Sequence, residues 1–405
     1  MTLSEELLYR GFVNQYTFSD ISELDKEPIT FYWGVDPSGS SMTVGHLAPA
    51  MMVRQFIEHG HKAVLLIGGA TGMIGDPDGK KQERNLLTIE QIEENKRKIV
   101  EQYRHVFAGQ PFEVVDNYDW FKDMGYLNFL REVGKKVPVS QLLDREFIKS
   151  RIGEDGAGIS YAEFSYNLIQ GYDFLHLFRD KGVTLQLAGA DQWGNSITGV
   201  QLIKQLERKD ANVFTTPLII NKATGVKFGK TEDGAIWLDP NLTTPYQFYQ
   251  FWLNMDDEFA KELIKKYTLL DKDTIEAVID EHDIAPQKRV LQRRLADESV
   301  RIIHGDKRLK TVHSMLSVFF ENGNPDELLN GDIDELAAEV PVVEAGLSVI
   351  DVLTASLFAD SKAAARRLVS GGGVKINDEK IDNGEQIISS KTLIKIGKNK
   401  FILVR

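Results

Sequence analysis

Short β-rich runs alternate with helical patterns over the first 220 or so residues, and this alternation constrains the fold more than any other feature of the chain. Strands are predicted at 29–35, 62–68, 112–115, 183–188 and 214–220. Helices are predicted between them, at about 46–59, 88–107, 140–150, 161–180 and 191–208. Strands that alternate with helices predict a parallel sheet with helices on both faces. Ligands of such sheets bind at the carboxyl ends of the strands, where the strand order reverses.

Composition sets the broad class. The chain has 405 residues, enough for two or three domains, and 42% hydrophobic with 27% charged residues is typical of a globular protein. No apolar run approaches the roughly 20 residues that a membrane span needs, and the charged N-terminal segment is not a secretory signal. The absence of cysteine excludes disulfides and thiolate metal sites, and we expect a cytoplasmic protein. A net charge of -12 argues against a purely electrostatic nucleic-acid binder.

The sequence pattern changes near Thr244. Residues 245–318 have a helical composition, and 321–344 carry eight acidic residues and no Lys or Arg, which indicates a linker with a short helix near 326–339. Residues 345–405 carry ten Lys or Arg against six Asp or Glu, a basic excess in an acidic protein. We expect four segments: a Rossmann-like α/β domain (1–243), a helical domain (244–320), the acidic linker (321–345) and a small α+β domain (346–405).

The string SMTVGH lies between a predicted strand and a predicted helix. A helix that starts there presents unpaired backbone N–H groups at the sheet's carboxyl edge, and these attract phosphate. Gly45 lets a nucleotide approach the backbone, and His46 is able to donate to a phosphate or ring oxygen. The alternative is a surface turn with a capping histidine.

The string GGATGMIGDPDGKK (68–81) resembles two phosphate-binding loops and matches neither. Its spacing fits neither the P-loop nor the dinucleotide fingerprint, so the NTPase and dehydrogenase interpretations are disfavoured. Asp76 could still bind an amine, and Lys80, Lys81 and Arg84 could meet a polyphosphate.

In the predicted helix FSYNLIQGYDFLHLF, Tyr166, Gln170 and Asp173 share one face because they recur at i, i+4 and i+7. Buried polar side chains need partners, so this face is either the wet side of the helix or a pocket for a small polar ligand. The string GVKFGKTEDG also has two interpretations. It is either a hairpin tip or a loop whose Lys227 and Lys230 hold a leaving pyrophosphate.

The joint order of these strings resembles the bacterial tyrosyl-tRNA synthetases, of the class I aminoacyl-tRNA synthetases, over essentially the whole chain. MTVGH looks like the class's His-Ile-Gly-His signature, and KFGKT like its Lys-Met-Ser-Lys-Ser signature. GATGMIGDP, FSYNLIQGYDF and GADQWGN are close to strings of the family. The basic segment DSKAAARRLVSGGGVKINDEKI looks like the S4-type RNA-binding module that ends these enzymes.

The resemblance implies a two-step reaction. The carboxylate of L-tyrosine attacks the α-phosphate of ATP, which enters with Mg²⁺, and pyrophosphate leaves. The tyrosyl group then passes to the terminal ribose of tRNA-Tyr. The resemblance also implies a homodimer and no membrane partner. Such an enzyme needs no covalent nucleophile, because it works by positioning and by stabilising charge on phosphorus.

The resemblance implies roles at matching positions. Tyr32 and Asp173 are expected on the phenol, and the remaining tyrosine-binding residues are Asp76, Tyr166, Gln170 and Gln186. The ATP side is expected to hold Asp36, Ser38, Gly45, His46, Asp191, Gln192 and Lys230. Catalytic contacts to the phosphates are expected from Thr43, His46, Lys80, Arg84, Lys227, Lys230 and Thr231, with no metal bound by the protein itself. A pocket that pairs a buried hydroxyl rejects phenylalanine by about 10⁴ to 10⁵.

The chain departs from the family pattern at Thr43, where the family has histidine. Threonine keeps a hydroxyl donor but is shorter and cannot be cationic. Our hypothesis is that Thr43 still reaches a γ-phosphate oxygen, directly or through water.

Three other interpretations compete. Tryptophanyl-tRNA synthetase shares the fold, but the Tyr32–Asp173 pair favours a phenol and the S4-like tail belongs with tyrosine enzymes. A non-catalytic RNA-binding protein on a synthetase scaffold remains an alternative because Thr43 stands where the family has a catalytic histidine. A nucleotide-binding oxidoreductase lacks its dinucleotide fingerprint.

Overall fold

The computed structural model describes the chain apart from residues 78–85, 144–145, 153–157, 221–224, 226–227, 232–233, 322, 324–327, 330–332, 377–378, 390 and 398–399. The described chain divides into two compact units. The first comprises Met1–Leu242 and Met255–Glu298, and the second comprises Thr243–Asn254 and Ser299–Arg405.

A six-stranded sheet organises the first unit, in the order β1-β6-β5-β2-β3-β4. Its strands are β1 (Gln15–Tyr16), β2 (Thr30–Val35), β3 (Lys62–Ile67), β4 (Phe112–Asp116), β5 (Leu185–Gly189) and β6 (Asn212–Thr216). All neighbours pair in parallel except the edge strand β1, which is antiparallel to β6. The chain runs outward from β2 to β4 and then returns to β5 on the other side of β2. The strand order therefore reverses between β2 and β5, where the sequence analysis expects the site.

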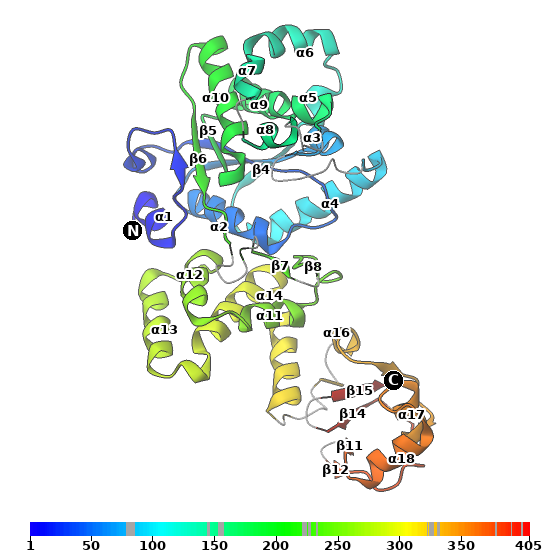
Figure 1. Ribbon diagram of the computed structural model, residues 1–405. Coiled ribbons are helices and arrows are strands. Elements are labelled where there is room, and N and C mark those ends of the chain that lie inside the picture. Colours follow the sequence, from blue (N-terminus) through cyan, green and yellow to red (C-terminus); the bar gives the residue numbers. More distant parts are fainter. Residues whose placement is uncertain are drawn as a thin grey trace. The chain divides into compact units, whose positions relative to one another are not determined.

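Helices cover both faces of this sheet (Figure 1): α2 (Val44–Glu58) and α4 (Ile89–Val106) lie on one side, and α9 (Tyr161–Lys181) and α10 (Trp193–Glu207) on the other. The central strand β3 is apolar on both faces for this reason and has five consecutive buried residues. Helix α9 begins where the Ser160 side chain accepts from the backbone N–H of Glu163, and it ends at Gly182 in the left-handed region.

Further short elements complete this unit. They are α1 (Leu3–Arg10), α3 (Gly69–Ile74), α5 (Tyr118–Phe121), α6 (Tyr126–Glu132), α7 (Val139–Leu143), α8 (Glu146–Ile152), the 3₁₀ turn η3 (Ala190–Gln192), the hairpin β7 (Lys230–Thr231) and β8 (Gly234–Ala235), α12 (Asp257–Tyr267) and α13 (Lys272–Ile284).

The second unit holds α11 (Pro245–Leu253), most of α14 (Val290–Phe320) and the C-terminal α+β segment. Helix α14 kinks at Gly305, whose φ of 81° is left-handed. A five-stranded sheet has the order β12-β11-β14-β15-β9, and a two-stranded sheet pairs β10 with β13. The remaining bounds are α16 (Ile333–Ala337), β9 (Val342–Val343), β10 (Leu347–Ser348), α17 (Val349–Ala355), α18 (Lys362–Ser370), β11 (Val374–Ile376), β12 (Glu379–Lys380), β13 (Ile387–Ile388), β14 (Thr392–Ile396) and β15 (Lys400–Val404).

Most predicted elements lie within two or three residues of the observed ones, and one strand does not. The strand predicted at 214–220 is β6, which ends at Thr216 because Pro217 has no N–H to continue the ladder. Within the helix predicted at 140–150, α7 and α8 lie on either side of residues 144–145, which are outside the described part of the chain. Within the helix predicted near 326–339, residues 328–329 and α16 are helical, and residues 324–327 and 330–332 lie outside the described part of the chain. The linker also contributes β9 to the C-terminal sheet. The four-segment division remains a prediction.

Within the described residues, no helix is long and apolar enough to cross a membrane.

Candidate active site

A carboxylate at the end of β2 anchors the site. The Tyr166 hydroxyl donates to Asp36 Oδ2 over 2.7 Å, and the Thr71 hydroxyl donates to Asp36 Oδ1 over 2.6 Å. Burial and the nearby charges of Asp36 and Asp76 raise the pKa of Tyr166 well above its ordinary value, so the phenol remains a donor at neutral pH. These bonds join β2, α3 and α9 at the point where the strand order reverses.

The glycine that follows β3 makes room for this carboxylate. A Cβ atom added at Gly68 would lie 2.0 Å from Asp36 Oδ1 and 2.2 Å from the Thr71 hydroxyl. No side chain fits there without displacing Asp36. The first glycine of GGATG is therefore explained by the approach of Asp36 and not by either known phosphate-loop pattern.

Asp173 is a buried carboxyl group on α9, only 2% exposed. Asn117 Nδ2 donates to its Oδ2 over 3.1 Å, and Trp120 Nε1 donates to its Oδ1 over 2.9 Å. Burial raises the pKa of Asp173 well above its ordinary value, and these two donors lower it in part. The two donors thus fix the orientation of the carboxyl group, and burial disfavours its charged form.

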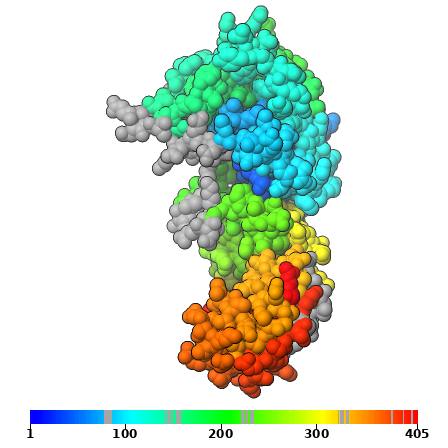
Figure 2. All heavy atoms as spheres, turned by 90° about the vertical axis from the view of Figure 1, so that its right-hand side faces the viewer, coloured from blue at the N-terminus to red at the C-terminus, as the bar shows by residue number. Residues whose placement is uncertain are grey.

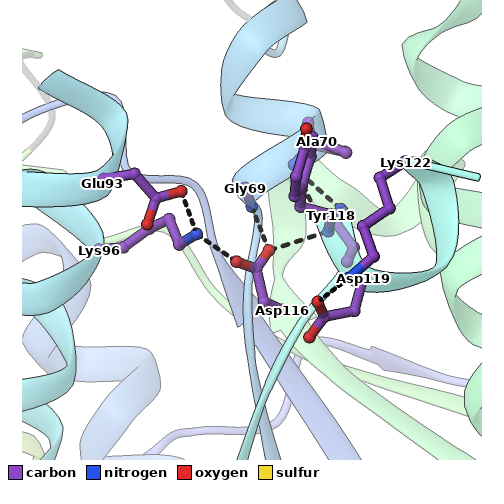
Figure 3. A network of polar contacts seen from close by, with 10 residues as sticks. Gly69, Ala70, Glu93, Lys96, Asp116, Tyr118, Asp119 and Lys122 are labelled. Atoms are coloured by element: carbon purple, nitrogen blue, oxygen red, sulfur yellow. Dashed lines mark hydrogen bonds and ion pairs between the residues drawn. The ribbon is translucent and has the colours of Figure 1, made fainter. Parts of the chain in front are cut away.

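The segment after β4 is tied to the start of α3, as Figure 3 shows. Asp116 Oδ1 accepts from the backbone N–H groups of Gly69 over 3.1 Å and Tyr118 over 2.9 Å. Its other oxygen forms an ion pair with Lys96, which also pairs with Glu93 over 2.6 Å.

Asn117, next along the chain, accepts from the backbone N–H of Ala70 over 2.7 Å. Its side-chain N–H₂ group donates to the Thr71 hydroxyl over 3.0 Å and to Asp173. The Asn117 amide therefore connects Thr71, which is bonded to Asp36, with Asp173.

Three buried polar atoms near these clusters have no hydrogen-bond partner among the described residues: the Tyr32 hydroxyl, Gln170 Oε1 and Gln186 Oε1. Tyr32 and Gln186 are paired residues of adjacent strands β2 and β5. Burial, and then the charge of Asp173, raises the pKa of Tyr32 well above its ordinary value. An unsatisfied buried polar atom costs roughly 1–3 kcal/mol, so these three atoms indicate a site built for a polar ligand.

Asp76 stands at the end of a chain of amides. Gln192 Nε2 donates to Asp76 Oδ2 over 2.6 Å, and Asn195 Nδ2 donates to Gln192 Oε1 over 3.0 Å. Asn167 Nδ2 in turn donates to Asn195 Oδ1 over 3.0 Å. The strings GATGMIGDP, FSYNLIQGYDF and GADQWGN therefore meet through their side chains.

The start of α2 brings the two other strings together. The backbone N–H of Thr43 donates to His46 Nδ1 over 3.1 Å, and the Thr43 hydroxyl lies 3.0 Å from the same nitrogen. A Cβ added at Gly45 would lie 3.4 Å from the Phe228 carbonyl oxygen, and one at Gly229 would lie 3.0 Å from Gly45 N. MTVGH and KFGKT are thus in contact, and Gly229, whose φ of 86° is left-handed, is the glycine that this close approach favours.

The structure describes some of the remaining expected site residues fully, some only in their backbone and some not at all. Ser38 is exposed in the turn after β2, and Asp191 lies in η3 after β5. The backbone of Lys230 and Thr231 forms β7, which pairs with β8 as a hairpin. The side chains of these two residues and all of Lys80, Arg84 and Lys227 lie outside the described part of the chain.

The sequence analysis missed the residues that support the site: Thr71, Asn117, Trp120, Asn167 and Asn195. Asn117 and Trp120 belong to the polar string DNYDW, which directly follows a predicted strand. The rule that sites lie at the carboxyl ends of parallel strands could have drawn attention to that string. Their partner Asp173 lies more than 50 residues away, and no local spacing indicates such a pair.

The fold and the site define the class of the protein. Residues 24–321, which include the parallel sheet and the strings MTVGH and KFGKT, match the family model described as "tRNA synthetases class I (W and Y)". A second model, "Tyrosine--tRNA ligase SYY-like C-terminal domain", matches residues 332–405. The chain belongs to the tyrosyl-tRNA synthetase family of class I aminoacyl-tRNA synthetases.

Relatives match over the full length. A tyrosine–tRNA ligase of Bacteroides fragilis is 44% identical, with 100% of this chain and 97% of that protein aligned. Tyrosine–tRNA ligase 1 of Bacillus subtilis is 40% identical, with 99% of each chain aligned. Among solved structures, a C-terminally truncated mitochondrial tyrosyl-tRNA synthetase of Aspergillus nidulans has a TM-score of 0.71 at 28% identity, covering 79% of this chain and 94% of that one.

Proposed function

We propose that Tyr32, Gln186 and Asp173 line a tyrosine pocket, in which this chain performs the reaction of a tyrosine–tRNA ligase. It activates L-tyrosine with ATP to tyrosyl-AMP, releases pyrophosphate and then transfers the tyrosyl group to the terminal ribose of tRNA-Tyr. The observation that carries the assignment to this pocket is the group of three buried polar atoms without partners among the described residues. Family membership supports the reaction itself.

The phenol end of the substrate fits Tyr32 and Asp173. The Asp173 carboxyl group, held by Asn117 and Trp120, accepts from the substrate hydroxyl, and the Tyr32 hydroxyl gains the partner that it lacks. Phenylalanine would leave the Tyr32 hydroxyl buried without a partner and would give Asp173 no bond beyond those from Asn117 and Trp120. Sites of this kind reject the analogue without the hydroxyl by about 10⁴ to 10⁵.

The ammonium end fits the opposite wall of the pocket. Asp76 supplies a carboxylate fixed by Gln192. The Tyr166 hydroxyl donates its hydrogen bond to Asp36, so its oxygen is oriented to accept from the ammonium group. Gln170 Oε1 is a further buried acceptor, and Gln186 lies beside the substrate on β5.

The nucleotide fits the region around the start of α2. Asp36, Ser38, Gly45, His46, Asp191 and Gln192 are proposed to line it, with Thr43, Lys80, Arg84, Lys227, Lys230 and Thr231 toward the pyrophosphate. The Thr43 backbone N–H makes His46 Nδ1 an acceptor, so the neutral ring carries its proton on Nε2 and presents a donor. Mg²⁺ is proposed to arrive on the phosphates of ATP as part of the substrate.

These residues supply geometry and charge and form no covalent bond. The Asp36–Tyr166–Thr71 bonds fix the wall between the amino acid and the nucleotide, so the attacking carboxylate and the α-phosphate meet in one orientation. Lysine and arginine side chains and the N-terminus of α2 then stabilise the charge that develops on the phosphates.

Two partners complete the proposal. The basic C-terminal segment is proposed to contact tRNA-Tyr, because cations on that segment would pair with phosphates in an otherwise acidic protein. A second copy of the chain is proposed to cover an exposed apolar area on α6, α7 and α9, where Leu127 is 78% and Tyr161 60% exposed. These residues, with Val139, border a cavity of about 520 Å³.

The experiment is ATP–pyrophosphate exchange with each amino acid in turn. We expect exchange that depends on tyrosine. Exchange with tryptophan and not with tyrosine would point to the related tryptophan enzymes, and the absence of exchange with any amino acid would favour a non-catalytic RNA-binding protein.

A further inference from the structure

His176 is stacked on Trp120. The imidazole and indole planes are inclined by 20°, and their centroids are 4.4 Å apart. His176 lies three residues after Asp173 on α9, so both side chains are on the same face of the helix. The indole therefore meets α9 at two points: its Nε1–H donates to Asp173, and its ring lies against His176.

Trp120 needs such support because its own element is weak. It belongs to α5, a helix of only four residues, which cannot hold a side chain by helical structure alone. Asp116, four residues earlier at the end of β4, is fixed by Lys96 and by two backbone N–H groups (Figure 3). These contacts fix the start of the segment and do not involve the indole.

A groove next to the stack leaves room for the indole to move. The groove has a volume of about 610 Å³ and lies at the edge strand β4, between α4 and the end of α9. Trp120 and His176 both line it, together with charged side chains such as Lys96 and Asp180. Helix α4, which forms one side of the groove, is light blue to cyan on the face shown in Figure 2. Without the imidazole, one face of the indole would border this space.

We infer that His176 is a positioning residue for the selection of tyrosine: by stacking on Trp120, it holds the indole N–H on Asp173 and so fixes the carboxyl group that receives the substrate phenol. The inference rests on the proposed role of Asp173. His176 touches no substrate itself and acts only through the indole.

The charge state of His176 agrees with this role. Burial lowers the pKa of the imidazole, an effect that Asp180 opposes and Lys181 and Arg179 reinforce. The ring is therefore neutral at neutral pH, and the contact is one between two neutral aromatic rings. Such pairs contribute enough to bias one orientation of the indole without being needed for the fold.

The test compares His176→Phe, which keeps a ring, with His176→Gln and His176→Leu, which do not. We expect the KM for tyrosine in pyrophosphate exchange to rise about two- to tenfold in the Gln and Leu variants, with kcat within about twofold of the wild-type value. The preference for tyrosine over phenylalanine should fall by a similar factor. His176→Phe should restore both quantities.

Arg179→Gln is the matched control, because Arg179 lies on the same helix and pairs with Glu207 instead of Trp120. Thermal unfolding of each variant identifies any that fails to fold, and Gln and Leu are two independent ways to remove the ring. Wild-type KM and selectivity in a folded Gln or Leu variant would overturn the inference, as would equal losses in the Phe, Gln and Leu variants.

An Asp173→Asn variant separates this inference from the function on which it rests. If Asp173→Asn loses tyrosine selectivity and the His176 variants do not, only the role of His176 is wrong. If Asp173→Asn also keeps wild-type selectivity, the proposed role of Asp173 is wrong, and the inference about His176, which depends on it, is wrong as well.

Discussion

The backbone N–H of Thr43 donates to Nδ1 of His46 over 3.1 Å, at the position where the family signature has its first histidine. The Thr43 hydroxyl lies 3.0 Å from the same nitrogen. In this chain Thr43, the first residue of the signature, therefore orients His46, its last residue. The hypothesis that Thr43 also reaches the γ-phosphate stays a prediction.

Substitutions at Thr43 separate the backbone contact from the hydroxyl contact. Thr43→Val removes the hydroxyl and keeps the N–H, so we expect kcat for pyrophosphate exchange to fall about two- to tenfold, the value of one hydrogen bond. Thr43→Ser should retain activity within about twofold. Full activity of Thr43→Val would show that the hydroxyl has no role, and a Thr43→His enzyme slowed tenfold or more would argue against simple equivalence with the family histidine.

Stability should depend on pH through Asp173. Burial raises the pKa of this carboxyl group well above its unfolded value, so the native state retains a proton that the unfolded chain has released. The stabilisation from this proton is complete below the ordinary Asp range and is lost as the pH rises through the raised pKa. We expect the free energy of unfolding of the tyrosine-free wild type to fall relative to that of Asp173→Asn over this window. The measurement is urea unfolding at several pH values, and parallel curves for the two proteins would contradict it.

The proposed contact between two copies can be disrupted at Tyr161. Tyr161 is the first residue of α9, and its hydroxyl lies 3.3 Å from that of Tyr126. Tyr161→Glu places a charge on the apolar area but in the first turn of a helix, where an acidic residue is favourable. We expect light scattering to find a dimer for the wild type and a monomer for Tyr161→Glu. Ile284→Glu, at another exposed apolar position, should remain a dimer. A monomeric wild type, or a dimeric Tyr161→Glu, would refute this contact.

Transfer to tRNA should depend on cations of α18. Arg366 and Arg367 are exposed there, and replacing both with Gln removes two positive charges far from any residue of the tyrosine pocket in sequence. We expect pyrophosphate exchange to be unchanged, tRNA charging to weaken, and the salt dependence of tRNA binding to decrease by about one to two phosphate contacts. Arg97→Gln with Lys98→Gln, the same charge change on α4, is the control. Equal effects of both pairs would remove the special role of the C-terminal segment.

The sequence predicted the sheet well because its strands are nearly continuous apolar runs, and burial on both faces leaves few other structures for them. It predicted the end of β6 poorly, because apolar residues continue past Pro217 while the ladder cannot.

The same limit applies to the site. Tyr166, Gln170 and Asp173 are recognisable from their spacing on one helix. Asn117 and Trp120 are not, because their role depends on contacts with Asp173 across the fold. Periodicity describes neighbours along a helix or strand, and it carries no information about which distant segment supplies the supporting hydrogen bonds.

The central claim is that the buried hydroxyl of Tyr32 and the carboxyl group of Asp173 recognise a phenol. Its most direct test is the ratio of kcat/KM for tyrosine and phenylalanine in pyrophosphate exchange, measured for the wild type, Tyr32→Phe and Asp173→Asn. We predict a wild-type ratio of about 10⁴ to 10⁵ and a decrease of at least about tenfold in each variant. A wild-type ratio near unity, or a ratio that neither substitution changes, would contradict the account.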